Sequence, residues 1–204
     1  MKKTLLLAIL VLALPAFAAA DPISIGQSIY FSDGPGGGNG GSYHVGLDTA
    51  SPTDFDTFCV EITETLSYGT RFVIGGIGTT TVATNHALGD EAAWLYHTFR
   101  TSVLPNWGNY SDSVRYSTLQ RAIWNNTGWS GQGDAGPWDN GLLTAWNTAF
   151  ASSGWTGTGD VVILNIIGTT VAGAPVNAQD VLALQPVPPS LGRRCSCSAW
   201  ASWG

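Results

Sequence analysis

The period of the hydrophobic pattern changes twice along the chain, and this change restricts the possible folds more than any other feature. Before about residue 86 and after about residue 152, apolar residues alternate with polar ones or form short apolar runs, as in strands. Between these points apolar residues recur at helical spacing. The sequence therefore predicts an α+β fold, in which a β-sandwich or barrel is interrupted by a helical insertion over about residues 86–152.

The pattern also places the individual elements. The glycine-rich segment 32–42 predicts a flexible connection, because it lacks the lysine and the following helix of a phosphate-binding loop. The glycines of segment 75–78 predict a hairpin turn between two short strands. The expected strands are 23–31, 43–47, 54–65, 71–74, 79–83, 161–167 and 178–184, and the expected helices are 90–102, 113–124 and 138–150.

The first twenty residues have the composition of a secretory signal peptide. Two lysines precede an apolar run from Thr4 to Leu14, and cleavage is expected after Ala18 or Ala20. We therefore expect the export machinery to be a partner, and the mature protein to be secreted or displayed at the cell surface. Residues 21–185 are expected to form a single domain.

The charge balance excludes one class of function. Lys2 and Lys3 are the only lysines, so the mature chain carries six arginines against 14 carboxylates. Nucleic-acid binding requires a basic surface, which this acidic chain does not provide. The low proportion of charged residues, 11%, together with 26 glycines and nine tryptophans, suits an extracellular β-rich domain.

Three cysteines are an odd number for an exported chain, in which an unpaired thiol is a liability. Cys195 and Cys197 lie one residue apart near the end of the chain, where mutual pairing would be strained. Cys59 lies in the expected strand 54–65, with Phe58 on the core face and the sulfur on the opposite face. The thiol of Cys59 must therefore be buried, paired or used.

Two short motifs resemble those of bacterial surface thioester domains. The first is segment 58–61, FCVE, which matches the aromatic-Cys motif of that family. The second is segment 119–124, LQRAIW, which is similar to the family's TQxAIW-like segment but begins with Leu119 in place of Thr. The resemblance covers about residues 54 to 128.

The resemblance implies an internal thioester between the sulfur of Cys59 and the side-chain carbonyl of Gln120. Such a bond is an electrophile that captures amines on a target surface. Tyr116 and Trp124 lie four residues on either side of Gln120 and share its helix face. These two aromatic side chains, with Phe58 beside the cysteine, are expected to shield the bond from water.

The expected role is therefore that of an adhesive surface or matrix protein. The chemistry is used once and needs no cofactor, so we do not expect an enzyme. The expected target is an amine-bearing surface molecule or exopolysaccharide.

Two alternatives remain open from the residues alone. In the first, Cys59 is a half-buried small hydrophobe and Gln120 a surface amide, in the same fold without the bond. In the second, the protein is a non-covalent carbohydrate-binding or structural module of the extracellular matrix, because tryptophans in glycine-rich loops can stack on sugars. These tryptophans are Trp107, Trp129, Trp138 and Trp155.

No metal site is expected. Asp134 and Asp139 have glycines nearby but lack the regular alternation and closing glutamate of an EF-hand loop. Glu61 and Glu64 lie three apart on an expected strand and would face opposite sides, which suits neither a carboxylate pair nor glycoside hydrolysis. The three histidines are not spaced along the sequence as metal ligands are. They are His44, His86 and His97.

Residues 186–204 resemble a degenerate C-terminal sorting segment of PEP-CTERM proteins. Segment 187–189, VPP, is similar to the Val-Pro-Glu-Pro that opens such a segment, but the glutamate and the following apolar helix are missing. The sequence that follows, rich in Arg, Cys, Ser and Trp, suggests a frameshift within an anchor. An intact segment would imply an exosortase-type sorting enzyme as a partner.

Overall fold

The computed structural model describes residues 20–36, 41–49, 54–129, 136–169 and 175–185. Within them, six strands form an antiparallel sheet in the order β3-β2-β1-β4-β5-β6, and the helices lie between β4 and β5. The fold is therefore α+β with a helical insertion, as the sequence predicts. The expected signal peptide and the tail 186–204, with Cys195 and Cys197, lie outside the described residues, apart from Ala20.

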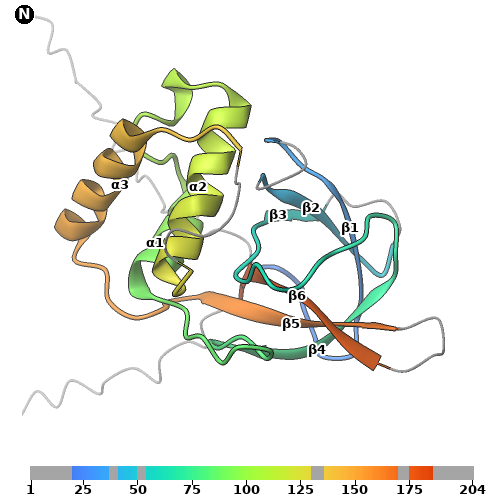
Figure 1. Cartoon of the computed structure of the whole chain (residues 1–204). Coiled ribbons are helices and arrows are strands. Elements are labelled where there is room, and N and C mark those ends of the chain that lie inside the picture. The colour runs from blue at the N-terminus through green and yellow to red at the C-terminus, as the bar shows by residue number, and fades with distance from the viewer. Residues whose placement is uncertain (1–19, 37–40, 50–53, 130–135, 170–174, 186–204) are drawn as a thin grey trace, which may run out of the picture.

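The helices gather on one side of the molecule and the strands on the other (Figure 1). None of the described helices is long and apolar enough to cross a membrane. The strands are β1 (Ser28–Asp33), β2 (Tyr43–Leu47), β3 (Phe55–Thr57), β4 (Phe72–Gly78), β5 (Val161–Thr169) and β6 (Pro175–Leu184). The helices are α1 (Asp90–Thr101), the short 3-10 helix Trp107–Asn109, α2 (Asp112–Asn126) and α3 (Asn140–Ser153).

Helix α3 shows how local sequence sets the boundaries in the insertion. Asp139 precedes the helix, and its side chain accepts a hydrogen bond from the Leu142 N–H at 2.8 Å. The helix ends at Gly154, whose φ of 71° is the left-handed conformation that favours glycine. Leu142 and Trp146 then point into the core from one face of the helix.

The glycines expected to form a hairpin turn lie instead inside a single strand, β4. The register with β5 shifts between Ile74 and Gly76, which marks a bulge. A Cβ at Gly75 would lie 2.2 Å from Cδ1 of Ile167 on β5. The glycine therefore permits a close approach of two strands rather than a reversal of the chain.

The expected strand 54–65 is regular over only three residues, β3. After β3 the chain crosses to β6, the strand at the opposite end of the order. There Cys59 forms an isolated antiparallel bridge with Val181. The Val60 N–H donates to the Asp180 carbonyl at 3.0 Å, and the Leu182 N–H donates to the Phe58 carbonyl at 3.2 Å. The two ends of the strand order, β3 and β6, are thereby brought together.

The segment after β3 runs between two hydrophobic clusters, and this explains a second difference from expectation. Phe58 and Val60 face a cluster formed mainly by the helices with β5 and β6, whereas Cys59 faces a cluster formed mainly by the strands. Both faces of the segment are therefore core. The prediction that the sulfur lies on a non-core face is wrong, since Cys59 is only 1% exposed.

Candidate functional site: a buried cysteine–glutamine pair

The structure brings the two motifs of the sequence into direct contact. Gln120 lies in the middle of α2 and is fully buried. Its side-chain oxygen Oε1 accepts a hydrogen bond from the Cys59 N–H at 3.0 Å, and its Nε2 donates to the Cys59 carbonyl at 2.7 Å. The Gln120 amide therefore lies flat against the backbone of Cys59.

The amide of Gln120 occupies the place of a neighbouring strand. In the bridge to β6, the hydrogen bonds are made by Phe58 and Val60, so the N–H and C=O of Cys59 point away from β6. A buried peptide group without partners would be costly. Gln120 supplies both a donor and an acceptor there, which explains a fully buried amide on a helix face.

The C-cap residue of α2 fixes the same segment. Thr127, seven residues after Gln120 and so on the same face, donates a hydrogen bond from Oγ1 to the Val60 carbonyl at 3.2 Å. The Ile123 carbonyl oxygen, 3.1 Å away, is a second acceptor within reach of the same hydroxyl hydrogen. Helix α2 therefore holds the chain at Cys59 and at Val60, and the position of Cys59 relative to Gln120 is set by more than one contact.

The sulfur of Cys59 has one polar neighbour that the sequence analysis missed, Tyr43. The β2–β3 register pairs Tyr43 with Thr57, and the Tyr43 hydroxyl lies near enough to the Cys59 sulfur to affect its pKa. Burial raises the pKa of the Cys59 thiol well above its ordinary value, while the interaction with the Tyr43 hydroxyl opposes that shift. The negative charges of Glu61 and Asp180 raise the pKa further, which favours the neutral form of the free thiol.

The three residues expected to shield the pair lie around it. Phe58 and Tyr116 stack with ring centroids 6.3 Å apart and planes 21° from parallel. Trp124 belongs to the strand-side cluster together with Cys59. Tyr116 and Trp124 are each less than a tenth exposed, and Phe58 is fully buried. The three side chains are buried, as shielding of the contact between Cys59 and Gln120 would require.

The loop tryptophans considered for sugar binding contact other side chains. Trp138 is 39% exposed, but the Arg121 guanidinium lies 4.1 Å from its ring centroid. The other three are partly buried against the two clusters. Their ring partners are Tyr116 and Trp146 for Trp107, His86 for Trp129, and His97 for Trp155.

The other residues considered as ligands are placed as follows. Asp139 caps α3, and Asp134 lies outside the described residues. The prediction that Glu61 and Glu64 face opposite sides is wrong, because the chain leaves the regular strand before both residues. They converge with Asp180 of β6, and one potential ligand atom from each of the three lies within 4.8 Å of the others. Each histidine has a different partner: Asp56 for His44, Trp129 for His86 and Asp160 for His97.

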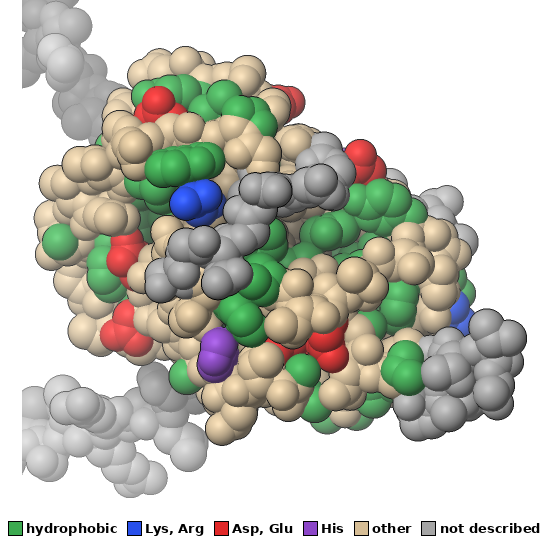
Figure 2. Space-filling view, viewed as in Figure 1, with side chains coloured by type: hydrophobic (Ala, Val, Ile, Leu, Met, Phe, Trp, Pro, Cys, Tyr) green, Lys and Arg blue, Asp and Glu red, His purple; other side chains and the backbone are tan. Residues whose placement is uncertain are grey.

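Glu64 is the most exposed of the three carboxylates, and the other two raise its pKa. Burial, which is the largest cause, and the charge of Glu61 together raise the pKa of Glu64 to about 7. Burial also raises the pKa of Asp180. On the face shown in Figure 2 charged side chains are sparse, and a small group of acidic side chains lies over the sheet.

Comparisons of the chain with protein-family models, with curated proteins and with solved structures gave no match. The function is therefore inferred from the chemistry of the site itself.

Proposed function

We propose that Cys59 and Gln120 form an internal thioester, and that the protein is an exported surface or matrix adhesin that captures amines covalently. The observation that carries the proposal is the pair of hydrogen bonds, 3.0 Å and 2.7 Å, that hold the Gln120 amide against Cys59. Both residues are buried, and no other cysteine is present among the described residues to pair with Cys59.

The proposed bond-forming step is an acyl transfer within this pair. The sulfur of Cys59 attacks Cδ of Gln120; the Sγ–Cδ bond forms and the Cδ–Nε2 bond breaks. The thiol proton leaves with the nitrogen, so the products are the thioester and ammonia. Attack on an unactivated amide is slow in water, and fixed proximity of the two groups lowers that barrier by several kcal/mol or more.

The backbone of Cys59 supplies a donor for the developing charge. During attack the oxygen Oε1 of Gln120 becomes negative, and this oxygen already accepts the Cys59 N–H at 3.0 Å. A preorganised backbone N–H at such an oxygen is the arrangement that stabilises tetrahedral intermediates in acyl transfer. The interaction with the Tyr43 hydroxyl favours the thiolate, which is the attacking form of the sulfur.

Capture reverses the chemistry with a new amine. The nitrogen of the target attacks Cδ, the Sγ–Cδ bond breaks, and the Gln120 side chain becomes a substituted amide while Cys59 regains its thiol. The chain has no lysine after Lys3, so no ε-amine of the mature domain competes with the target. The aromatic residues around the pair slow the competing hydrolysis by water.

Methylamine labelling tests this function. Purified protein treated with methylamine is expected to carry one adduct at Gln120, found by peptide mapping, and one newly reactive thiol at Cys59. Cys59→Ala should carry neither, and Trp138→Ala should label like the wild type. A protein that stays unlabelled, yet loses binding to an exopolysaccharide when Trp138 is removed, would instead be a non-covalent carbohydrate-binding module.

A further inference from the structure

We propose that Glu61, Glu64 and Asp180 form a binding site for one calcium ion, between the segment after β3 and strand β6. This site is separate from the contact between Cys59 and Gln120, and the proposal does not depend on a thioester.

The spacing of the three carboxylates fits one cation. One ligand oxygen from each lies within 4.8 Å of the other two. Calcium binds oxygen at about 2.3–2.6 Å, so two oxygens on opposite sides of the ion are about 5 Å apart. A single ion can therefore contact all three side chains without a large movement of the backbone.

Buried oxygen atoms without partners point independently to a missing positive charge. Glu61 is fully buried, and its Oε1 accepts a hydrogen bond from Thr84 at 2.7 Å, but its Oε2 has no partner. Oε2 of Glu64 is likewise buried without a partner. Among the described residues, none of the three carboxylates forms an ion pair with arginine or histidine. Buried carboxylates are costly unless they are paired or bind a metal.

Asp180 is held as a fixed ligand. Its Oδ1 accepts the Ile166 N–H at 3.0 Å, and its Oδ2 accepts the Val82 N–H and the Asn165 side-chain amide, both at 2.9 Å. Ligands that are oriented by surrounding hydrogen bonds bind metals more tightly than free ones. A cation would therefore link the segment after β3 to a carboxylate that is already in place.

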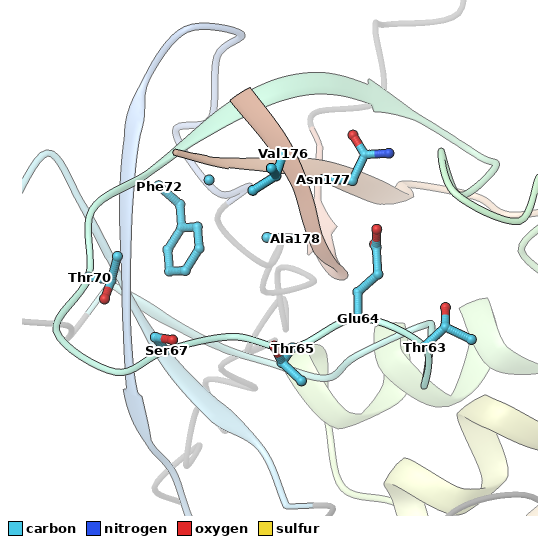
Figure 3. Close-up of a pocket in the computed structure, with 10 residues that line it drawn as sticks. Thr63, Glu64, Thr65, Ser67, Thr70, Phe72, Val176, Asn177 and Ala178 are labelled. Carbon is cyan, nitrogen blue, oxygen red and sulfur yellow. The ribbon is translucent and has the colours of Figure 1, made fainter. Parts of the chain in front are cut away.

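The donor set and the access route favour calcium over other cations. The ligands are all carboxylates, which suits hard cations, and magnesium usually takes one or two carboxylates in strict octahedral geometry. A pocket of about 380 Å³ lies beside Glu64, lined by Thr63, Asn177 and Ala178 among others. Figure 3 shows Glu64 within this pocket, on the segment that faces β6. The pocket gives a hydrated ion a route to the carboxylates and leaves room for water ligands.

Calcium titration of the purified protein tests the site. After treatment with a chelator, calorimetry with CaCl2 is expected to give one ion per chain. A calcium concentration of about a hundred times the Kd should raise the melting temperature by about 5 to 10 °C. Glu64→Gln removes one ligand at the edge of the site and should abolish most of that rise. In chelator this variant should be at least as stable as the wild type, because it relieves repulsion between carboxylates.

Two controls separate specific binding from general effects of charge and salt. Glu91→Gln makes the same change at a half-buried glutamate on α1, outside the cluster, and should keep the full calcium effect. Cys59→Ala should also keep it, which separates the cation site from the thioester. The proposal is overturned if calcium fails to bind the folded protein, if Glu64→Gln responds like the wild type, or if magnesium gives an equal shift at equal ionic strength.

Discussion

At the scale of single residues, Gln120 has a structural role and a proposed chemical one. Its amide completes the hydrogen bonding of the buried Cys59 peptide groups, and the same contacts hold it against the backbone of that cysteine. The structural role does not depend on the chemical one, and the contact supports the proposed thioester.

Tyr43 is the residue with which the chemistry of Cys59 can be tested without disturbing Gln120. Tyr43→Phe removes the hydroxyl that lowers the pKa of the Cys59 thiol. Because this interaction favours the thiolate, we expect thioester formation after refolding to slow by about tenfold or more. The measurement is the rate at which one ammonia is lost, followed by intact mass.

Tyr68→Phe is the matched control for this prediction. Tyr68 packs near Tyr43 and is half-exposed, and its hydroxyl donates a hydrogen bond to Asp33 at 3.1 Å. This variant should form the bond at the wild-type rate. Equal rates for Tyr43→Phe and the wild type would show that the Tyr43 hydroxyl has no part in the reaction.

Part of the site can be predicted from the sequence, and there is a physical reason why the rest cannot. Cys59 and Gln120 stood out because each carries a short local motif. Tyr43 carries no such signal, since its contact with Cys59 depends on how β2 and β3 pair. Glu61 and Glu64 were placed on opposite sides because a regular strand was assumed, whereas the chain there crosses to β6.

At the scale of elements, the helices were predictable and the irregular strands were not. The helical segments have apolar residues at a clear period, and Asp139 and Gly154 mark the ends of α3 by local rules. In β4 the run of glycines looks like a turn, and the requirement for Gly75 comes from Ile167, some ninety residues later in the chain. Contacts between residues so far apart in the chain leave no local pattern in the sequence.

The junction of α1 with α2 gives a stability prediction at this scale. Gly89 precedes α1, and a Cβ there would lie 2.5 Å from the Asn126 carbonyl oxygen at the end of α2. Because the neighbour is backbone, Gly89→Ala must move one helix, and we expect a loss of about 1–3 kcal/mol of unfolding free energy. Denaturant unfolding measures this loss.

Gly108→Ala is the control for the junction. Gly108 lies in the 3-10 helix of the same insertion, and nothing would lie within 4 Å of its Cβ. This variant should change the unfolding free energy by less than about 0.5 kcal/mol. Similar losses for both variants would mean that close helix packing at Gly89 is not the cause.

At the scale of the whole molecule, the beginning and the end of the described domain are joined. The Asp21 N–H donates to the Leu184 carbonyl at 2.9 Å, and an Asp21 carboxylate oxygen accepts the Leu184 N–H at 2.8 Å. The same carboxylate forms a largely buried ion pair with Arg100 of α1 at 2.9 Å. One residue thus connects the first described segment, the last strand and the helical insertion.

This junction is expected to contribute strongly to stability. Asp21→Asn leaves the Arg100 charge buried without its partner, so we expect a loss of about 3–5 kcal/mol. Asp112→Asn breaks the ion pair with Arg115 on the surface, where Asp112 is 60% exposed, and should cost less than about 1 kcal/mol. Thermal or denaturant unfolding compares the two. Equal effects would argue against a structural role for Asp21.

The intact mass of the natively purified protein shows whether Cys59 and Gln120 are joined by a thioester. If the thioester forms, the mass is lower than that of the processed sequence by one ammonia, and no thiol of Cys59 reacts until the bond is opened. Cys59→Ala and Gln120→Ala should each have the full mass of their own sequences. A wild-type protein of full mass, with a Cys59 thiol that titrates once the protein is unfolded, would contradict the account and leave Gln120 as a structural partner of the Cys59 backbone.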